Sequence, residues 1–596
     1  MPDDTNKPTT DQSSQQVQGN QQNISGEVTG PVVGGNVGQI GNRTITNVYN
    51  LLPSLTRRQW RTVGLALLSV LIVLTAYATR SLWLPQPHCL PDQTCLLIAA
   101  FGPANEPKAN EITAALEQEL RGILDAASVT DVAIVRSRSV ADGQAAQVLA
   151  TDEGSLLVIW GRVFASENKT RIYFELADRL GVGESGQVRP YRAEPLGYDP
   201  VAGRLECTAC IDITGEVTQR THVIAWFALG LAHYTAGQPE AAQPSFLAAL
   251  HCAGEEVARA LLPVRPDCAP PDKADPAETA LIRYYLGKSY VLQGDYGQGI
   301  AHLTGTAQAN PNDPGVWIAI GEAYTNWYGD ALANPPLAAA AFANAEQAVR
   351  RLPPATLATE RAFALGLIDE LQGEPAAALT EYRKAVDNFA VDDPGGYVSL
   401  LALARAQAET GQPDDAEATL RRAADLLPDA PWAHLELARL LADDRAGAEA
   451  LIERARRAAP DEAYVSIIQA ELCVVWGDQA CAAEAYTQAL QLRPNSGWLH
   501  SRVGDFYLPT SPPVAGQSWE EAESHYRIAV ELRPADPWVH QRLGYVLLNF
   551  GKNSEAAAEY ATAIRLLPDD LPPGELGCTL AEAQRRAGLP VTGACP

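Results

Sequence analysis

The sequence predicts a mainly α-helical protein, in which an α-solenoid follows a disordered or β-prone tail, one transmembrane helix and a small α/β domain. Three observations support this prediction. Residues 220–570 repeat a pattern of small and large apolar residues about every 34 positions, residues 86–205 alternate strand-like and helix-like segments, and residues 62–79 are apolar and uncharged. With 596 residues, 46% of them hydrophobic and 19% charged, the chain can form several folded units.

The net charge restricts the class of partner. The chain carries 45 Lys and Arg against 71 Asp and Glu, which gives a formal net charge of −26. Nucleic-acid binding is therefore not expected, because proteins of that class usually need a basic face to neutralise phosphates. The one methionine, Met1, also excludes a Met-rich promiscuous groove.

The predicted cytoplasmic tail, residues 1–57, has two parts. Residues 1–24 are too polar to fold alone, whereas residues 24–50 interleave Val and Ile with Gly and predict short β segments with glycine turns. Gln39-Ile40-Gly41-Asn42 resembles the core of the amyloid-forming RHIM-type motif, although Gly38 stands where that motif has Val or Ile. Self-association through residues 24–50 and a flexible juxtamembrane linker remain alternatives.

Residues 60–84 predict one membrane-spanning helix. Its ends carry Trp60 and Trp83, where an interfacial aromatic belt is expected. The flanking positive charges lie mainly on the N-terminal side, at Arg57, Arg58 and Arg61, with Arg80 after the span. The positive-inside rule then predicts a single-pass plasma-membrane protein with a cytoplasmic N-terminus and extracytoplasmic C-terminal domains. A cleaved signal peptide and a buried core helix are the alternatives.

The cysteines predict an oxidising compartment. All ten follow the predicted span and form five close sequence pairs: Cys89 with Cys95, Cys207 with Cys210, Cys252 with Cys268, Cys473 with Cys481, and Cys578 with Cys595. Five local disulfides explain this distribution, although the first four cysteines permit other connectivities. Metal binding and a redox-active Cys207–Cys210 dithiol are the alternatives, but a second C-x-x-C motif and a thioredoxin-like pattern are both missing.

Residues 86–205 predict an extracytoplasmic α/β domain. Strand-like runs at 95–101, 132–135, 156–163 and 171–180 alternate with helical spacing at 110–126 and 139–150. The arrangement resembles the TolB amino-terminal domain through Phe101-Gly102, Ile134-Val135, Val158 to Val163 and Ile172 to Leu176. Asp152 to Ser155 departs from the usual small-Ala-Asp of that domain. The resemblance implies an extracytoplasmic or envelope assembly and supplies no catalytic residue.

Residues 220–570 carry the repeat. A Leu-Gly or Leu-Ala step is followed by Gly, Ala, an aromatic residue or Leu, and finally Pro, as at Leu403-Ala404, Gly411, Ala416, Leu420 and Pro428. The second residue of each step, which we call the marker, stands at Gly230, Gly287, Gly321, Gly366, Ala404, Ala438, Ala470, Gly504 and Gly544. This pattern resembles the tetratricopeptide family. The resemblance implies about nine antiparallel helix pairs and a binding groove, and residues 571–596 predict a C-terminal capping helix.

Three repeats begin with Trp-x-His, at Trp432, Trp498 and Trp538. We interpret these tryptophans either as groove anchors for a protein partner or as packing against the preceding repeat. The three histidines two positions later occupy equivalent places in different repeats. Because neighbouring helices lie about 8–10 Å apart, a shared metal site is not expected.

The sequence predicts no enzyme, cofactor or metal site, because it contains no catalytic triad order, phosphate loop or H-E-x-x-H motif. The Lys and Asn pattern by which some family members bind a C-terminal carboxylate is also missing. The leading hypothesis is a membrane-anchored scaffold that binds a protein or peptide in its groove. A signalling receptor with a self-assembling tail and a non-catalytic subunit of an envelope or polysaccharide assembly are the alternatives.

Overall fold

The structure is a computed structural model that describes residues from 94 onward. It covers 94–102, 107–130, 132–140, a few positions from 145 to 155, 157–164, 169–176, three strands between 197 and 214, and 220–593 apart from 258–261, 263–265, 267, 269–270, 272–275, 330–334, 353–357, 389–393, 429, 461 and 510–515. Met1–Gln86 and Pro87–Pro596 are separate units. The predicted tail, with its β-prone residues 24–50, lies outside the described residues.

One part of the predicted fold class is wrong. The prediction included a transmembrane helix, but none of the helices that the structure describes combines the length and the apolar character needed to cross a bilayer. The segment proposed for this role, residues 60–84, lies outside the described residues. The described chain is mainly helical, and its helices form the repeat array.

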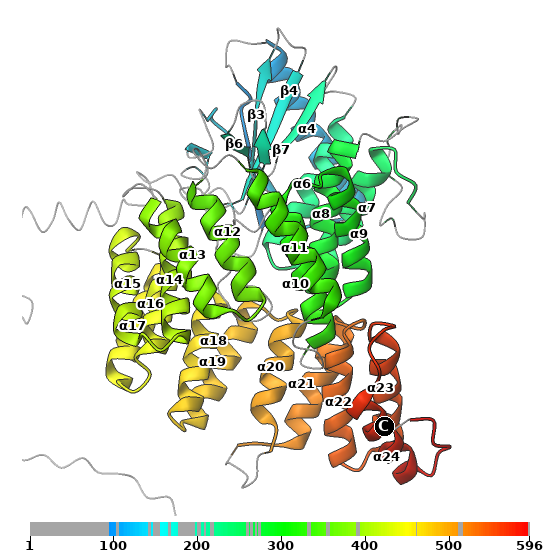
Figure 1. Ribbon diagram of the computed structural model, residues 1–596. Helices are drawn as coiled ribbons and strands as arrows, with labels where there is room; N and C mark the ends of the chain where they lie inside the picture. The colour runs from blue at the N-terminus through cyan, green and yellow to red at the C-terminus, as the bar shows by residue number, and fades with distance from the viewer. Residues whose placement is uncertain are drawn as a thin grey trace, which may run out of the picture. The chain divides into compact units, whose positions relative to one another are not determined.

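The α/β unit contains one mixed five-stranded sheet with the order β2-β1-β3-β4-β7 (Figure 1). Its strands are β1 (Thr94–Ala99), β2 (Val132–Ser137), β3 (Leu157–Phe164), β4 (Lys169–Leu176) and β7 (Cys210–Thr214). β1 is parallel to β2 and β3, whereas β4 is antiparallel to β3 and β7. The short strands β5 (Gly197–Asp199) and β6 (Arg204–Cys207) form a separate antiparallel pair. The sheet therefore continues beyond residue 205, where we expected the domain to end.

Helix α4 (Pro107–Ala127) covers one face of the sheet. Ile112, Leu116 and Leu120 recur at helical spacing, so they share one side of α4 and are almost fully buried against the sheet. The opposite sheet face carries Trp160, whose ring stacks on Tyr173 with a centroid distance of 4.0 Å. Ala146 and Leu149 pack on this face, so both faces are covered, as expected for a sheet in which β1 is buried along its whole length.

The rest of the described chain forms nine consecutive helix pairs and one final helix. Repeats 1 to 9 are α6 (Thr221–Thr235) and α7 (Pro239–Cys252), α8 (Pro276–Leu292) and α9 (Tyr296–Ala309), α10 (Pro314–Tyr328) and α11 (Pro336–Arg351), α12 (Ala358–Leu371) and α13 (Pro375–Asn388), α14 (Pro394–Glu409) and α15 (Pro413–Leu426), α16 (Pro431–Leu440) and α17 (Arg445–Ala458), α18 (Ala463–Val475) and α19 (Gln479–Leu492), α20 (Gly497–Tyr507) and α21 (Trp519–Leu532), and α22 (Pro537–Asn549) and α23 (Asn553–Leu566), followed by α24 (Gly574–Ala587).

The small marker residues let the two helices of a repeat approach closely. A Cβ atom built on Gly321 would lie 2.4 Å from the ring of Phe342 on the second helix, and one on Gly366 would lie 2.7 Å from the ring of Tyr382. Gly411, seven positions after its marker, has φ of +76° and ends the first helix in a left-handed turn. Each recurring residue therefore has a steric reason in the pair.

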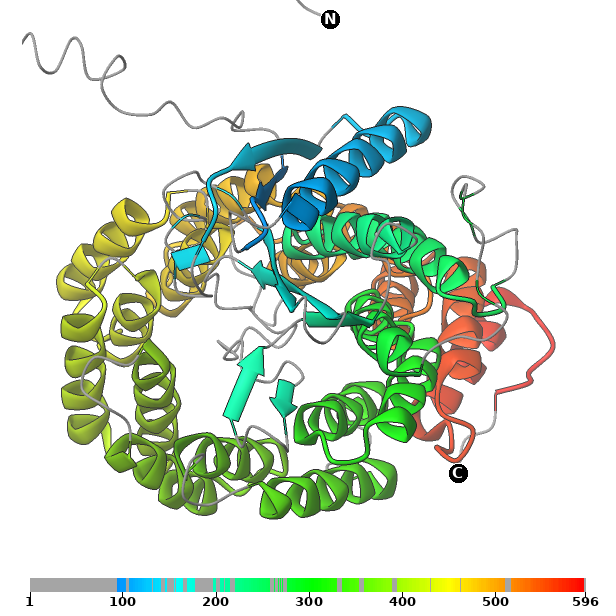
Figure 2. The same ribbon diagram turned by 90° about the horizontal axis from the view of Figure 1, so that it is seen from above.

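Buried apolar side chains in the described part of the chain form three clusters along the array. The first joins the sheet and α4 to repeats 1–3, and Phe174 of β4 contacts Phe227 of α6 edge-on at 5.0 Å. The second extends from Ile318 in α10 to Val503 in α20. The third begins at Ala522 in α21 and includes the final helix α24. Within residues 87–596 the helices follow one another around a ring (Figure 2).

Candidate protein-binding surface

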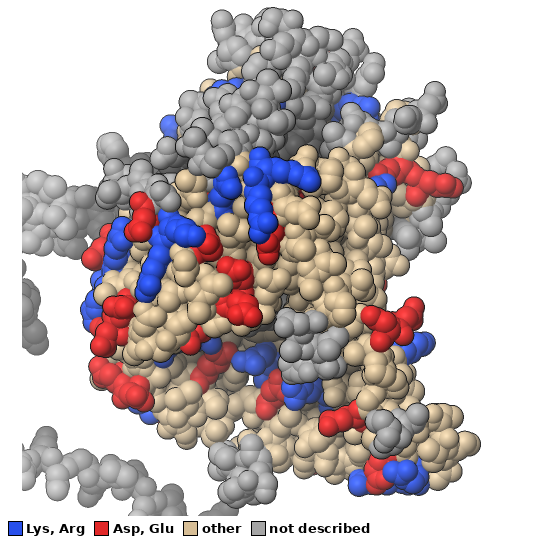
Figure 3. All heavy atoms as spheres, in the orientation of Figure 1, with Lys and Arg blue, Asp and Glu red and all other residues tan. Residues whose placement is uncertain are grey.

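Charged side chains on the first helices of repeats 4 to 9 form an alternating ladder. We call the surface of α12, α14, α16, α18, α20 and α22 that carries this ladder the first-helix face. Its charged residues are Glu370, Arg405, Glu436, Arg439, Glu471, Arg502, Asp505 and Arg542. Figure 3 shows acidic and basic side chains intermixed over one side of the molecule. A partner at this face would meet charges of both signs.

The ladder begins with a nearly buried ion pair. Arg405 Nε lies 3.1 Å from Glu370 Oε1, and the two side chains are only 13% and 9% exposed. The Tyr382 hydroxyl donates to the other Glu370 oxygen at 2.6 Å. Burial opposes the charge of Arg405, but Glu370, Tyr382 and Glu436 outweigh burial and raise the pKa of this guanidinium. The guanidinium therefore keeps its charge, and its contact with Glu370 fixes α12 against α14.

The rest of the ladder is more exposed. Glu471 bridges two arginines, with Arg439 at 3.4 Å and Arg502 at 2.8 Å, and both arginine side chains are more than 40% exposed. Farther along, the Asp505 carboxylate accepts a hydrogen bond from the Tyr526 hydroxyl at 2.6 Å and lies 3.5 Å from the Arg542 guanidinium. These exposed charges can exchange their present partners for those of a bound segment at little cost, because exposed ion pairs contribute little stability.

Sequence reasoning missed this ladder, although the sequence contains a signal for it. Arg405, Arg439, Glu471 and Asp505 each follow a marker residue directly. Equivalent positions in successive repeats lie side by side, so charges at one repeat position must meet along the array. Comparing that position together with the one two residues before the marker, where Glu436, Arg502 and Arg542 stand, would have predicted the exposed part of the ladder.

An apolar hollow lies between α10 and α12. It encloses about 330 Å³, including its open mouth, and is lined by Pro314, Gly315, Ile318, Glu360, Phe363, Ala364 and Leu367. Ile318 and Phe363 come from the first helices of neighbouring repeats, so the hollow marks the joint between repeats 3 and 4. Most of that volume is open to solvent, and the enclosed part would hold about one water molecule, so the hollow cannot take up a side chain unless its walls move.

The three tryptophans predicted as candidate partner anchors lie in different surroundings. Trp432 is only 3% exposed and packs against Tyr464, with ring centroids 5.5 Å apart, so it forms part of the core. Trp498 is half-buried beside the Arg502 guanidinium. The indole N–H of Trp538 donates to the Asn326 carbonyl at 3.0 Å. The structure does not place the three on one open surface, and a role for Trp498 or Trp538 in partner binding stays a prediction.

The three histidines of the Trp-x-His segments share one contact. Nε2 of His434, His500 and His540 lies 3.3, 3.0 and 3.0 Å from the carbonyl oxygen of a proline six positions earlier. These prolines, Pro428, Pro494 and Pro534, lie two residues after the end of the second helix of the preceding repeat. Each imidazole therefore joins its repeat to the one before it, and the three do not meet.

The Nδ1 partners of these histidines differ. Nδ1 of His500 lies 3.1 Å from Nδ1 of His525, and burial, together with His500, lowers the pKa of His525 to about 4. Nδ1 of His540 lies 2.6 Å from a Glu559 oxygen. Burial opposes the charge of His540, but Glu559, Pro534 and Asp536 outweigh burial and raise its pKa. In the described part of the chain, no three His, Cys, Asp or Glu residues are grouped to hold a metal ion.

Two of the five predicted disulfides are present in the described residues. Cys252 bonds to Cys268 and Cys473 to Cys481, each with Cα atoms 5.7 Å apart. Cys95 and Cys578 are also disulfide-bonded, and no cysteine that the structure describes is free. The other predicted cysteines, Cys89, Cys207, Cys210 and Cys595, have side chains outside the described residues.

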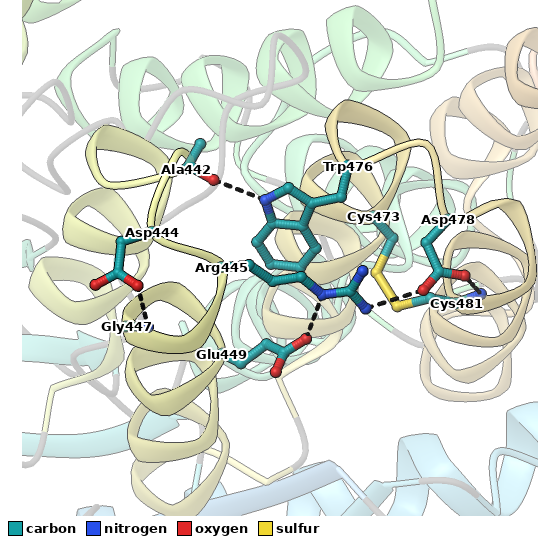
Figure 4. Close-up of polar contacts among 9 residues, drawn as sticks. All are labelled: Ala442, Asp444, Arg445, Gly447, Glu449, Cys473, Trp476, Asp478 and Cys481. Carbon is teal, nitrogen blue, oxygen red and sulfur yellow. Dashed lines mark hydrogen bonds and ion pairs between the residues drawn. A yellow bond between two sulfur atoms is a disulfide. The ribbon is translucent and has the colours of Figure 1, made fainter.

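The Cys473–Cys481 disulfide lies beside a polar contact between repeats 6 and 7 (Figure 4). The Trp476 indole N–H donates to the Ala442 carbonyl at 2.7 Å. Arg445 lies over that indole and also binds the Asp478 carboxylate at 2.9 Å. The second Asp478 oxygen accepts the Cys481 backbone N–H at 3.1 Å and caps α19. The disulfide therefore fixes a turn that holds the neighbouring repeat.

Comparisons with known proteins bear on the repeats. Residues 398–440 and 514–570 match two family models, both described as tetratricopeptide repeat. Both matched ranges fall on consecutive helices of the array. None of the curated proteins matches the chain.

Solved structures similar to the chain have low sequence identity. The crystal structure of yeast Tom70 is 15% identical and has a TM-score of 0.31, with 62% of this chain and 81% of that chain covered. MamA residues 41 to the end from Desulfovibrio magneticus RS-1 are 17% identical with a TM-score of 0.23, covering 28% of this chain and 94% of MamA. Neither similarity tests the resemblance to a TolB amino-terminal domain. The two family matches and the helix pairs together show that this chain contains tetratricopeptide repeats.

Proposed function

We propose that this chain is a non-catalytic scaffold that holds a protein or peptide partner on the first-helix face of its repeats. The observation that carries the proposal is the ladder, because its exposed part crosses four first helices with charges of alternating sign. Solenoids commonly bind extended segments along such a surface. The fitting partner is an extended segment that carries both acidic and basic residues.

Affinity capture from the native source tests this function. The variant Glu471→Gln/Arg502→Gln removes the bridging pair, which lies between first helices. The matched control Glu417→Gln/Arg421→Gln removes an exposed pair within the second helix α15. We expect the first variant to capture at least about ten-fold less partner than the unchanged chain, because two contacts of about 1 kcal/mol each are removed. Equal capture by both variants and the unchanged chain would contradict the proposed surface.

We further propose that the repeats operate on the extracytoplasmic side of the membrane. The support is the Cys252–Cys268 and Cys473–Cys481 disulfides, because such bonds persist in oxidising compartments. To check the location, intact cells are quenched under denaturing conditions with an alkylating reagent, and the peptides are examined by mass spectrometry. We expect these four cysteines to be labelled only after a reductant has been added. Labelling without reductant would contradict the location.

A further inference from the structure

The two ends of the repeat array touch one another, although more than 200 residues separate them. The indole N–H of Trp327 in α10 donates to the Leu566 carbonyl at 2.8 Å. The indole N–H of Trp538 in α22 donates in the reverse direction, to the Asn326 carbonyl at 3.0 Å. The two tryptophans thus form a reciprocal pair of bonds between the third and the ninth repeats.

Further contacts extend this meeting of the ends. The Tyr328 hydroxyl donates to a carboxylate oxygen of Asp570, and Tyr328 is only 1% exposed. Arg493 donates to the Ala236 carbonyl at 3.3 Å, so repeat 1 also contacts the end of repeat 7. We call the contacts of residues 236, 326–328, 493, 538, 566 and 570 the clasp. On the N-terminal side of the clasp, residue 236 lies in the turn of repeat 1 and residues 326–328 lie at the end of the first helix of repeat 3.

Two apolar clusters face each other at the clasp. Trp327 packs against the apolar cluster of repeats 1–3, whereas Trp538 packs against that of α21–α24. The repeats at the clasp are therefore joined through hydrogen bonds and through packing of the Trp538 ring on Gly329. Such bonds add little net stability, because water replaces them when they break.

We propose that the clasp is a reversible conformational device: it opens while all nine repeats stay folded, and its opening separates repeats 1–3 from repeats 7–9. Opening breaks these polar contacts and the packing of the Trp538 ring on Gly329, whereas the three apolar clusters along the array stay intact. Sub-global openings of this kind cost less free energy than unfolding. Opening would also free the indole of Trp538, one of the tryptophans that the sequence suggests as an anchor.

Closure also follows from the geometry of a solenoid. Each repeat is rotated slightly relative to the one before it, and these rotations add until a later repeat lies beside an early one. A small change at the joints along the array would therefore accumulate into a large displacement at the clasp. The clasp is the place where curvature of the whole array can be held or released.

The test compares two double variants of the full chain, each of which removes two indole N–H groups. Trp327→Phe/Trp538→Phe removes the reciprocal clasp bonds. Trp317→Phe/Trp476→Phe removes bonds to Pro311 and Ala442, which are both contacts between adjacent repeats. Both double variants, and the parent chain used for comparison, also carry Asn326→Cys, because Asn326 contributes only its backbone carbonyl to Trp538. Labelling of the introduced thiol by iodoacetamide is followed by mass spectrometry of its peptide.

We expect the clasp variant to label at least about ten-fold faster than the parent that carries Asn326→Cys alone, because each lost bond is worth about a factor of five. The control variant should label at the parent rate. Small-angle X-ray scattering should show a larger radius of gyration for the clasp variant alone. Labelling of the parent should depend less steeply on urea than global unfolding does, because clasp opening exposes much less surface than unfolding of the whole array.

Three results would overturn the proposal. Equal acceleration in both double variants would mean general destabilisation, and unchanged labelling in the clasp variant would mean that these bonds do not hold the ends. A steep urea dependence of labelling in the parent would mean that position 326 becomes accessible only on global unfolding. If the clasp variant fails to fold, Tyr328→Phe supplies the same comparison, because it removes only the hydroxyl bonded to Asp570.

Discussion

The joints between neighbouring repeats and the clasp between the array ends join the same kind of helix pair in different ways. From α10 to α20 the repeats share one continuous apolar cluster. At the clasp, two tryptophans exchange backbone hydrogen bonds and their cores stay separate. Apolar burial is non-directional and hard to reverse locally, whereas hydrogen bonds can exchange with water. Under the proposal made above, what fills a contact, rather than the elements that make it, decides whether the contact can open.

The largest expected effect comes from cutting into the core of one repeat. Tyr560 is 1% exposed, and a Cβ atom on Gly544 would lie 3.1 Å from its ring. Tyr560→Ala should lower the free energy of unfolding by about 3–5 kcal/mol, because it leaves a cavity between α22 and α23. Urea denaturation followed by circular dichroism measures this loss. Tyr545→Ala in the same repeat, 46% exposed, should cost less than about 1 kcal/mol, and equal losses would contradict the core assignment.

The disulfide at the contact between repeats 6 and 7 should rank next. Replacing Cys473 and Cys481 together by Ala should cost about 2–3 kcal/mol, since the bond closes a loop with a sequence separation of 8. Guanidinium denaturation of the double variant and the parent gives the difference. An unchanged midpoint would show that Trp476 and Arg445 hold this turn without the covalent bond.

The close approach of the two helices within a repeat predicts an intermediate loss of stability when a marker glycine is replaced. Gly321→Ala should cost about 1–3 kcal/mol, because the added Cβ would meet Phe342 at 2.4 Å. In the matched variant Gly122→Ala in α4, the added Cβ has no atom within 4 Å. This variant should raise the free energy of unfolding by up to about 1 kcal/mol, because Ala has the higher helix propensity. Thermal unfolding of both variants should therefore shift in opposite directions, and a shared direction would refute the steric role of the marker.

Replacing one acidic residue of repeat 4 should increase the folding stability by an amount that depends on pH. Burial, together with Glu381, Glu346 and Glu374, raises the pKa of Asp369 to about 6. Since the folded pKa exceeds the unfolded value, ionisation of Asp369 costs stability progressively as pH rises from about 4 to 6. Asp369→Asn should then stabilise the chain by about 1 kcal/mol at pH 7.5 and by little at pH 4. Asp387→Asn, an exposed change on α13, is the control, and a gain independent of pH would exclude the ionisation argument.

The smallest effect concerns the imidazole between repeats 8 and 9. Glu559 helps to raise the pKa of His540, so their interaction stabilises the fold when His540 is protonated. That stability is fully present below the unfolded pKa of about 6.5 and is lost as pH rises through the folded pKa. Glu559→Gln should cost about 0.5 kcal/mol at pH 5.5 and almost nothing at pH 9. A loss of the same size at both pH values would mean that protonation is not involved.

The sequence predicted the helix pairs well because each marker needs only its neighbour in the same repeat. Gly366 and Tyr382 lie sixteen positions apart and meet within one repeat, so their spacing is visible in the chain. The strand β7 escaped prediction because five residues give too little alternation to distinguish it from a linker.

The clasp could not be predicted in this way. Trp327 and Leu566 are 239 positions apart, and their contact depends on rotations summed over six repeats. No local pattern encodes that sum. The place of Trp538 in the repeat is compatible with a groove anchor or with packing against the preceding repeat, and it does not indicate the bond from its indole N–H to Asn326. Contacts that depend on the curvature of a solenoid therefore require the structure.

The shared core of the sheet and the first repeats has a consequence for biosynthesis. Phe227 and Val223 of α6 are buried in the cluster that also contains Phe174 and α4. The α/β unit emerges from the ribosome before the repeats, and N-terminal domains generally fold first during synthesis. Repeat 1 can then dock on a finished surface, and each later repeat finds its predecessor already in place. The sheet thus acts as a template for vectorial assembly, and α24 completes the array at its other end.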